Sequence, residues 1–351
     1  MSNTTQQGTV KWQSPANIAL IKYWGKAGHQ IPANPSISFT LNNSYTEMEL
    51  QWETKPESNE LDITFFFEGK ENPKFRQKIA DFLQTLVAEY PFLKTLKITI
   101  HSENSFPHSA GIASSASSMS ALALCLCSLE NIFLNTLNTE SEFFHKASFL
   151  ARLASGSASR SVYGGLVTWG EIEGLANSSN EVATPLQAAT HEIFKTYQDA
   201  VMVVSRSEKA TSSSAGHALM DAHPFKEARY AQARRNMQAI IKAIAEGDTE
   251  TFGRITEEEA LTLHGLMMTS EPSVLLLLGN SLEIIHKLRT FRNEKRLPVC
   301  FTIDAGPNIH ILYPAEIKKE VDSFIVAELA QLCESQYWIA DHVGNGPKKL
   351  K

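Results

Sequence analysis

Several features are scarce in this sequence of 351 residues, and each scarcity excludes a class of protein. There are only four cysteines and no CxxC pair, so neither a disulfide framework nor a zinc site is indicated. Positive charge is not in excess: 32 Lys and Arg against 38 Asp and Glu give a net charge of −6, which disfavours a nucleic-acid partner. No apolar run approaches the roughly 20 residues of a membrane span, and the polar N-terminus has no signal-peptide core. We expect a globular, cytoplasmic protein with reduced thiols and no membrane segment.

Hydrophobic periodicity predicts an α+β protein of two domains. Strands are predicted at 18–24, 36–41, 45–52, 61–67, 96–101, 165–169, 200–205, 298–303, 308–313 and 337–341. Helices are predicted at 75–90, 113–129, 140–153, 225–246, 248–268, 273–292 and 315–333. The longest apolar run, 274–278, is expected inside a core helix. A polar loop precedes residue 190, so we place the domains at 1–190 and 191–351. Strands and helices do not alternate regularly, which disfavours a doubly wound sheet.

Residues 107–123 run from small residues into an Ala- and Leu-rich helix. A helix N-terminus presents unpaired N–H groups and partial positive charge, so it can hold a phosphate. Gly111 would let the backbone approach such a ligand, and Ser114, Ser115 and Ser118 could add hydroxyls. No GxxxxGK[S/T] motif occurs, so this is not a Walker A loop. A serine-capped helix packed on a sheet explains the composition about equally well.

Three further segments place charged residues beside glycines at predicted strand or loop ends. Lys22 and Lys26 follow an apolar strand and could bind phosphate or carboxylate. Arg160 lies in the Ser- and Gly-rich segment 154–165, and its planar guanidinium suits the oxygens of an anion. Asp304 stands where a strand meets a Gly-Pro turn, a rigid place for a catalytic carboxylate. Taken singly, each is explained as well or better by solvated lysines, a connector with a surface arginine, or a turn-forming aspartate. Together they suit phosphoryl transfer to an anionic acceptor.

These segments resemble motifs of the GHMP kinase superfamily and, within it, of the diphosphomevalonate decarboxylases. Residues 107–123 resemble the superfamily's phosphate loop, P-x-x-x-G-L-x-S-S-A, with Ile112 at the Leu position. That loop alone would fit any member of the superfamily. The segments NIALIKYWGK, SGSASRSVYGG and DAGPN are more specific, because they are similar to signatures of the decarboxylase branch. The resemblance runs from about residue 8 through 342–347.

The resemblance implies a fold and a reaction. The fold would be the two-domain GHMP kinase fold, with the active site in the cleft. Its N-terminal, ATP-binding domain would be like ribosomal protein S5 domain 2, and its C-terminal domain would be a GHMP α/β sandwich. In the reaction, ATP would phosphorylate the 3-hydroxyl of mevalonate 5-diphosphate, and loss of phosphate and CO2 would give isopentenyl diphosphate. ATP and Mg2+ would be the cofactors, and relatives suggest a homodimer.

The resemblance also assigns roles to individual residues. Asp304 would orient the 3-hydroxyl and take its proton, Lys22 would stabilise developing negative charge, and Arg160 would hold the substrate carboxylate. The other substrate-binding residues would be Tyr23, Trp24, Gly25, Lys26, Arg76, Ser155, Gly156, Ser157, Ala158, Ser159, Ser212 and Ser213. The residues that bind the nucleotide, with Mg2+ at its phosphates, would be Ser102, Asn104, Pro107, Gly111, Ala113, Ser114, Ser115 and Ser118.

Two positions depart from the family pattern. Pro35 stands where relatives often have Ser, which removes a hydroxyl and a backbone donor near the substrate loop, and Ser213 stands where some relatives carry an arginine. Two other functions stay open: a small-molecule kinase that stops at phosphorylation, and a catalytically silent relative that serves as a binding or scaffold subunit. The presence of Lys22, Arg160 and Asp304 together argues against both.

Overall fold

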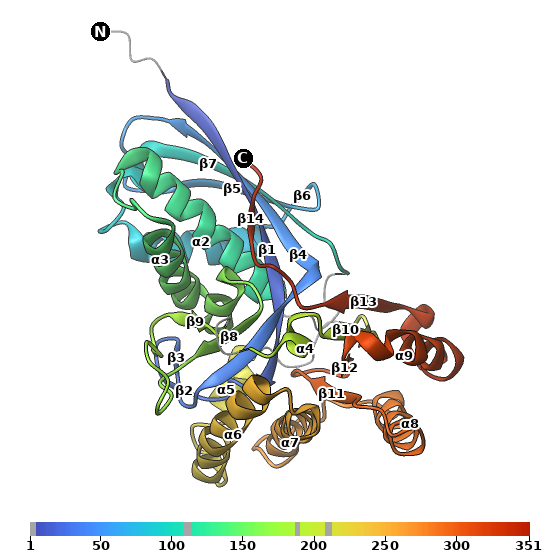
Figure 1. Ribbon diagram of the computed structural model, residues 1–351. Helices are drawn as coiled ribbons and strands as arrows, with labels where there is room; N and C mark the ends of the chain where they lie inside the picture. The colour runs from blue at the N-terminus through green and yellow to red at the C-terminus, as the bar shows by residue number, and fades with distance from the viewer. Residues whose placement is uncertain (1–4, 108–113, 187–189, 208–212) are drawn as a thin grey trace.

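Two long antiparallel strands, β1 (Gln7–Ile21) and β4 (Ser36–Thr54), form the centre of the N-terminal half (Figure 1). The computed structural model describes residues 5–107, 114–186, 190–207 and 213–351. Both strands are longer than the sequence predicts, because polar residues inside them are buried. Ser14 donates to the hydroxyl of Ser120 at 2.7 Å, for example, and Asn17 donates to the hydroxyl of Ser161 at 2.8 Å. Hydrogen bonds of this kind allow a polar side chain to lie in a strand interior.

The N-terminal sheet has helices on one face. Its strand order is β14-β1-β4-β7-β5-β6, with β8 pairing to the first part of β4 and β9 to β8. The remaining strands are β5 (Asp62–Phe67), β6 (Lys70–Glu71), β7 (Leu96–Asn104), β8 (Leu166–Trp169), β9 (Ala183–Pro185) and β14 (Lys348–Lys349). Helices α1 (Pro73–Leu86), α2 (Ser114–Phe133) and α3 (Glu140–Ala154) share one hydrophobic core with β1, β4, β5 and β7. Figure 1 shows α2 and α3 side by side over this sheet.

Helix α2 is apolar on every side because it is buried on nearly every side. In the described part of the chain it is the one helix whose length and composition would suit a membrane span, and 83% of that apolar window is buried inside the protein. Such a helix is expected at the centre of a soluble core as well as in a bilayer. Here its N-terminal serines project from the core toward a pocket described below.

The C-terminal half contains a second antiparallel sheet of order β11-β12-β10-β13. Its strands are β10 (Gln198–Met202), β11 (Cys300–Ile303), β12 (Ile309–Tyr313) and β13 (Trp338–His342). Helices α8 (Gly279–Lys295) and α9 (Lys318–Phe324) pack on one face. Helices α6 (Lys226–Glu246) and α7 (Thr249–Met268) pack toward the N-terminal half. Among the shorter elements are β2 (Lys26–Gly28), β3 (Ile31–Pro32), α4 (Glu192–Lys195), α5 (Ser213–Ala218) and the 3-10 segments Pro91–Thr95 and Gly156–Val162.

One hydrophobic core is shared by the two halves. Ile18, Leu20 and Phe39 of β1 and β4 pack in the same buried cluster as Met237 of α6 and Phe252 of α7. The halves therefore meet through a core-like interface and not through an exposed linker. The domain boundary near residue 190 stays a prediction.

Two predicted helices differ from the structure. The helix predicted at 273–292 begins only at Gly279, and the prediction that 274–278 lies in a core helix is wrong. This segment is extended: Val274 and Leu276 turn toward a buried cluster, while Leu275 is 75% exposed. Such alternation is the side-chain period of an extended chain. The predicted helix at 315–333 is helical but divided, with 3-10 turns on both sides of α9 and a π-helical turn after it.

The chain after β13 returns to the N-terminal sheet, and we call residues 343–349 the C-terminal strap. Gly344 donates its N–H to the Thr40 carbonyl at 2.7 Å and accepts from the Gly165 N–H at 2.9 Å. Strand β14 then pairs with β1 at Trp12 and Gln13. Figure 1 shows the strap lying along β1. It joins the N-terminal half next to the segment that carries Arg160.

Candidate active site

Lys22 and Asp304, far apart in sequence, form an ion pair between the two halves. Lys22 directly follows β1 and Asp304 directly follows β11, so each stands where a strand ends. Lys22 Nζ lies 2.7 Å from Asp304 Oδ1 and 2.7 Å from the Ala19 carbonyl oxygen. The Lys22 side chain is 2% exposed and that of Asp304 is 26% exposed. Burial lowers the pKa of Lys22, while the negative charge of Asp304 acts in the opposite direction. The pair is a buried cation next to an accessible carboxylate.

Arg160 is a second buried cation, on the 3-10 segment Gly156–Val162. Its Nε donates to Ser38 Oγ at 2.8 Å, Nη1 to Ser36 Oγ at 2.6 Å and Nη2 to Asn17 Oδ1 at 3.4 Å. These partners are neutral, and no ion pair joins Arg160 to a carboxylate in the described ranges. Burial lowers the pKa of Arg160 to about 10, so it is still charged at neutral pH. A buried cation held only by neutral groups is suited to bind an anion.

Aromatic rings surround the segment after Lys22. The ring of Tyr23 lies 4.7 Å from that of Trp169 and 4.3 Å from that of His217, centroid to centroid. The Tyr23 hydroxyl is buried and makes no hydrogen bond to any described residue, so it is available to a ligand. Trp24 packs between α5 and α7, where its side chain is part of a buried hydrophobic cluster. Gly25 has φ of +97°, and a Cβ there would collide with Tyr230, so the backbone needs glycine at this turn.

His217, which the sequence analysis did not single out, holds this turn. Its Nδ1 accepts the Gly25 N–H at 3.0 Å, and its residue is 7% exposed. Burial, aided by the charge of Lys26, lowers the pKa of His217 to about 3, so the ring is neutral near pH 7. A histidine at this position gives no sequence signal, because helix α5 is short and polar.

His217 should make the protein sensitive to acid. Its pKa lies below that of an unfolded histidine, about 6.5, so the unfolded state binds the extra proton first. Stability from this group is complete above pH 6.5 and declines as the pH falls toward 3, by up to about 1.4 kcal/mol per pH unit. Denaturant unfolding at pH 5.0 to 7.5 should show this slope in the wild type. The slope should be smaller in His217→Asn, which keeps an acceptor without the titration. Equal slopes would remove His217 as the cause.

Lys26 and Lys78 bring two more positive charges to the site. Lys26 is half-buried on β2, and burial lowers its pKa. Lys78, an exposed residue of α1, has a pKa lowered by desolvation and also by the charge of Lys26. Cations that lower each other's pKa favour a bound anion. Lys78 was not predicted from the sequence. Arg76, which was predicted on the same helix, is also exposed and makes no ion pair within the described residues.

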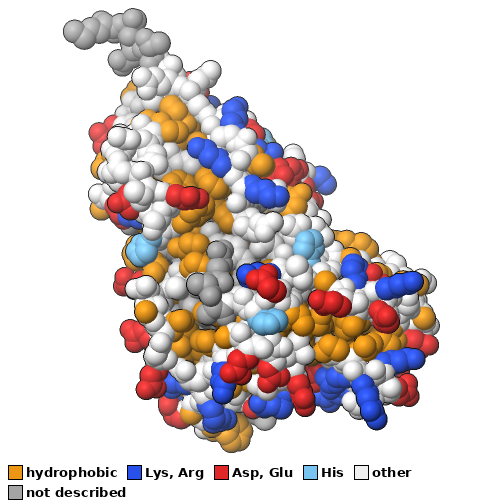
Figure 2. All heavy atoms as spheres, viewed as in Figure 1, with side chains coloured by type: hydrophobic (Ala, Val, Ile, Leu, Met, Phe, Trp, Pro, Cys, Tyr) orange, Lys and Arg blue, Asp and Glu red, His pale blue; other side chains and the backbone are white. Residues whose placement is uncertain are grey.

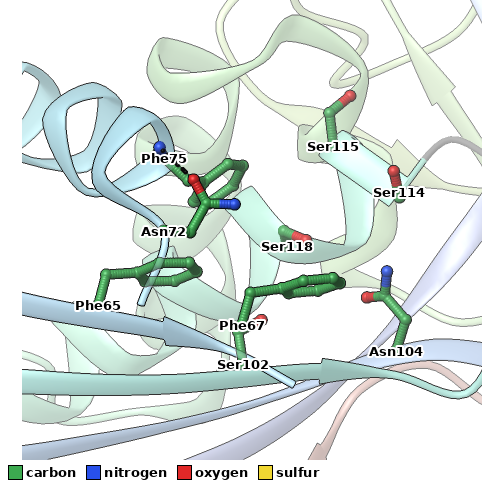
Figure 3. A pocket seen from close by; sticks show the side chains of 9 residues that line it. All are labelled: Phe65, Phe67, Asn72, Phe75, Ser102, Asn104, Ser114, Ser115 and Ser118. Carbon is green, nitrogen blue, oxygen red and sulfur yellow. Dashed lines mark hydrogen bonds between the residues drawn. The ribbon is translucent and has the colours of Figure 1, made fainter. Parts of the chain in front are cut away.

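A pocket of roughly 190 Å³ opens at the start of α2 (Figure 3). It is lined by Phe65, Phe67, Asn72, Phe75, Ser102, Asn104, Ser114, Ser115 and Ser118. In Figure 3 Ser114 and Ser115 lie at the start of α2, away from Phe65 and Phe75, and Ser118 lies between Phe75 and Phe67. Asn72 caps α1 by accepting the Phe75 N–H at 3.0 Å. The four serines and Asn104 were predicted for the nucleotide. Asn72 and the three phenylalanines were not, because a helix cap and phenylalanines in a strand and a helix resemble ordinary structure. Flat rings opposite hydroxyls suit a base with its phosphates.

The other predicted residues fall into three groups. Ser155 and Ser157 are half-buried, whereas Gly156, Ala158 and Ser159 are buried, and Ser159 donates its hydroxyl to the Gly156 carbonyl at 2.8 Å. Pro107 is half-buried at the end of a described range. The predicted residues outside the described ranges are Gly111, Ala113 and Ser212, together with the side chain of Ser213.

Positive charge is concentrated at this site and not over the visible surface. Figure 2 shows Lys and Arg intermixed with Asp and Glu over one face of the molecule. The whole chain has a net charge of −6. Buried Arg160, buried Lys22 and half-buried Lys26 therefore supply the local field that an anionic ligand would meet.

Comparison with known proteins gives a consistent result. The family model described as "Diphosphomevalonate decarboxylase-like N-terminal domain" matches residues 14–180, and "Mevalonate 5-diphosphate decarboxylase C-terminal domain" matches 200–349. The chain is 32% identical to the diphosphomevalonate decarboxylase of Eremothecium gossypii, over 90% of this chain and 80% of that protein. It is 31% identical to the Saccharomyces cerevisiae enzyme, over 90% and 81%.

Solved structures agree with the sequence comparison. The mevalonate diphosphate decarboxylase of Staphylococcus aureus superposes with a TM-score of 0.83 at 27% identity, covering 99% of both chains. MDDEF in complex with MVAPP, AMPPCP and magnesium superposes with a TM-score of 0.81 at 26% identity, covering 99% of this chain and 100% of that one. The two-domain α+β architecture predicted from the sequence is confirmed.

Proposed function

The chain belongs to the diphosphomevalonate decarboxylase family, and from this premise we propose how its own residues divide the reaction. The enzyme is a carboxy-lyase that uses ATP to convert (R)-5-diphosphomevalonate to isopentenyl diphosphate, ADP, phosphate and CO2, by way of phosphorylation at the 3-hydroxyl. The observation that carries the proposal is the 2.7 Å contact between buried Lys22 and accessible Asp304.

Asp304 and Lys22 would act on the phosphorylation step. Asp304 orients the 3-hydroxyl and accepts its proton as the oxygen bonds to the γ-phosphorus and ADP leaves. Because a tertiary alcohol is a poor nucleophile, positioning and electrostatics supply most of the rate. Lys22 is a buried cation whose ammonium group donates to Asp304, and it stabilises the negative charge that develops on the 3-oxygen.

Arg160 would act on the second step. The carbon–oxygen bond to the phosphate breaks and the phosphate departs. The bond to the carboxylate then breaks, and its electron pair forms the double bond of the product. Arg160, held by Ser36 and Ser38, keeps the carboxylate in line for this loss. Its fixed fork suits two carboxylate oxygens. Tyr23, whose hydroxyl is buried without a partner among described residues, would contact the substrate beside it.

The aromatic pocket at the start of α2 would hold the nucleotide. Ser102 and Asn104 lie on β7 and the serines of α2 lie opposite, so base and phosphates have separate walls. The enzyme uses ATP with Mg2+. The pocket is compatible with Mg2+ that is bound to the phosphates of ATP. Its walls offer hydroxyl oxygens, and the described residues contain no cluster of three or more His, Cys, Asp or Glu. Mg2+ bound mainly by phosphates needs no more than this, and it neutralises their charge.

A substrate panel tests the function. Purified protein is given ATP and Mg2+ with mevalonate, its 5-phosphate or its 5-diphosphate, and ADP and CO2 are measured together. We expect equal amounts of ADP and CO2, with the 5-diphosphate preferred. ADP without CO2 would identify a kinase that stops at phosphorylation. The absence of both with all three compounds would indicate a catalytically silent relative.

Lys26 should affect binding more than turnover. We expect Lys26→Met to raise the KM for the diphosphate about tenfold or more with little change in kcat, because the lysine pairs with phosphate in both ground state and transition state. Lys195→Met is a matched control, since Lys195 is an exposed residue of α4 that pairs with Glu192. An unchanged KM in Lys26→Met would exclude Lys26 from the substrate site.

We also propose a cytoplasmic homodimer. The four cysteines are all free and buried, which supports a reducing compartment. Analytical ultracentrifugation of the full chain would test the oligomeric state, and a single species of 38.9 kDa would contradict the dimer.

A further inference from the structure

A fully buried ion pair lies behind the catalytic lysine. Arg229 on α6 and Glu259 on α7 have side chains that are both 0% exposed. Arg229 Nη1 donates to Glu259 Oε1 at 2.8 Å and Nη2 donates to Oε2 at 2.6 Å, the fork-to-fork geometry of a strong pair. Asn236 Nδ2 adds a third bond to Oε1 at 2.9 Å. We call Arg229 and Glu259 the helix clamp.

The helix clamp holds the peptide groups of Lys22 on both sides. The Lys22 N–H donates to Glu259 Oε2 at 3.0 Å. The Lys22 carbonyl accepts from Arg229 Nη2 at 3.0 Å and from Asn34 Nδ2 at 3.0 Å. Strand β1 ends at Ile21, so Lys22 is the first residue beyond the strand. Side chains of the C-terminal half thus satisfy the backbone of a catalytic residue that belongs to the N-terminal half.

Stability alone does not account for charges in this place. A buried ion pair usually gains little over an apolar pair of similar volume, because both charges lose their hydration. What an apolar pair could not do is bind an N–H and a C=O of the same residue. The helix clamp therefore offers an acceptor to the Lys22 N–H and a donor to the Lys22 carbonyl, which an apolar pair could not do.

We propose that Arg229 and Glu259 are positioning residues for phosphoryl transfer and decarboxylation: they fix the backbone of Lys22 so that its ammonium group meets Asp304. This rests on the proposed roles of Lys22 and Asp304. It adds a reason for the two halves to pack tightly, since α6 and α7 complete the site from behind.

The helix clamp also acts on the charge of Lys22. The charged groups that act on this ammonium are Asp304 after β11, Glu259 of α7 and Arg160 of the 3-10 segment. The two carboxylates favour its protonated form, and Arg160 disfavours it. Arg229 touches the Lys22 carbonyl and is paired with Glu259. Removing the charge of Glu259 alone would leave Arg229 unpaired and make Lys22 easier to deprotonate.

The first test replaces the helix clamp by apolar residues of similar volume, Arg229→Met with Glu259→Leu. No buried charge is then left unpaired, but the Lys22 N–H and the Asn236 amide lose their acceptor, so we expect a folded variant with a lowered unfolding midpoint. We expect kcat to fall about 100-fold, the usual cost of misplacing a catalytic group by about 1 Å. We expect the KM for ATP to change less than threefold. A stable double variant with wild-type kcat would overturn the proposal.

The second test, Glu259→Gln, keeps size and does not depend on the double variant's folding. Lys22 must be protonated to act, so activity falls as pH rises through its pKa. We expect this alkaline limb of kcat to move to lower pH in Glu259→Gln. Glu257→Gln is the control: Glu257 is also buried on α7, but it pairs with Arg292 and Arg289 of α8. An unmoved limb in Glu259→Gln, or an equal movement in Glu257→Gln, would also overturn the proposal.

A crystal structure of Glu259→Gln separates this proposal from the proposed function. The 2.7 Å contact between Lys22 and Asp304 should lengthen or break, whatever substrate the enzyme takes. If the wild type failed on all three mevalonate derivatives, the proposed function would fall while this structural result could still stand. An unchanged contact would overturn the positioning role alone.

Discussion

Replacing Asp304 with Asn should lower kcat about 10²- to 10⁴-fold, the usual contribution of a positioned general base. The amide cannot take the proton of the 3-hydroxyl. It also leaves the buried ammonium of Lys22 without the carboxylate now 2.7 Å away, so both members of the pair are impaired. Binding of ATP should be retained, because the aromatic pocket contains neither residue. Steady-state kinetics with the 5-diphosphate, together with ATP titration by calorimetry, measure the two effects separately.

Asp199→Asn is the matched control for this variant. Asp199 is a buried aspartate of the same sheet, 2.7 Å from His310, and has no assigned role in the reaction. Its replacement should cost stability without a comparable loss of kcat. If Asp304→Asn folded and had nearly the wild-type kcat, the role of Asp304 would be limited to forming the turn, in which its carbonyl accepts the Gly306 N–H at 2.7 Å.

Replacing Arg160 with Lys should lower kcat/KM about 30- to 4000-fold. Truncating one partner of a buried, hydrogen-bonded charge pair costs about 2–5 kcal/mol, and about 1.4 kcal/mol corresponds to a factor of ten. Lysine keeps the charge but offers one point donor in place of a planar fork. It also cannot reach Ser36, Ser38 and Asn17 at once, so the cation would lose its orientation.

The products distinguish a carboxylate-binding role for Arg160 from a structural one. In Arg160→Gln the ratio of CO2 to ADP should drop below one, since phosphorylation can proceed where decarboxylation is impaired. Arg152→Lys is the control, because Arg152 is also buried and donates to the carbonyls of Glu181 and His29. Nearly normal kcat/KM in Arg160→Lys would show that charge suffices and that the fork is unnecessary.

Local signals in the sequence predict much of the fold. Helix α3 is an example, since Thr139 and Glu142 form a capping box at its start, as an N-terminal signature predicts. Strand β4 is a counter-example. Residues 42–44 are polar and interrupt the predicted pattern, yet the strand continues because the N–H groups of Asn42 and Asn43 donate to Asp341. That partner comes from the other end of the chain, so no local pattern could reveal it.

The candidate site shows the same division. Lys22 and Asp304 were predicted because their segments occur together with the Arg160 segment and resemble family motifs; taken singly, each has an ordinary structural explanation. Arg229 and Glu259 were not predicted, since charged residues on long amphipathic helices usually face solvent. Their burial depends on the packing of α6 and α7 against β1, which is tertiary information. His217 was missed because its short, polar helix gives no sequence signal of a buried histidine.

The C-terminal strap bears on how the chain folds as it is synthesised. The outer edge of β1 at Trp12 and Gln13 is paired by Lys349 and Lys348. During synthesis β1 is therefore made long before the residues that close this edge. Contacts this distant in sequence form slowly, and an open strand edge invites pairing with other chains in the meantime. Nascent chains held before the strap emerges should accordingly be the species most dependent on chaperones, although helices α1 to α3 are already complete.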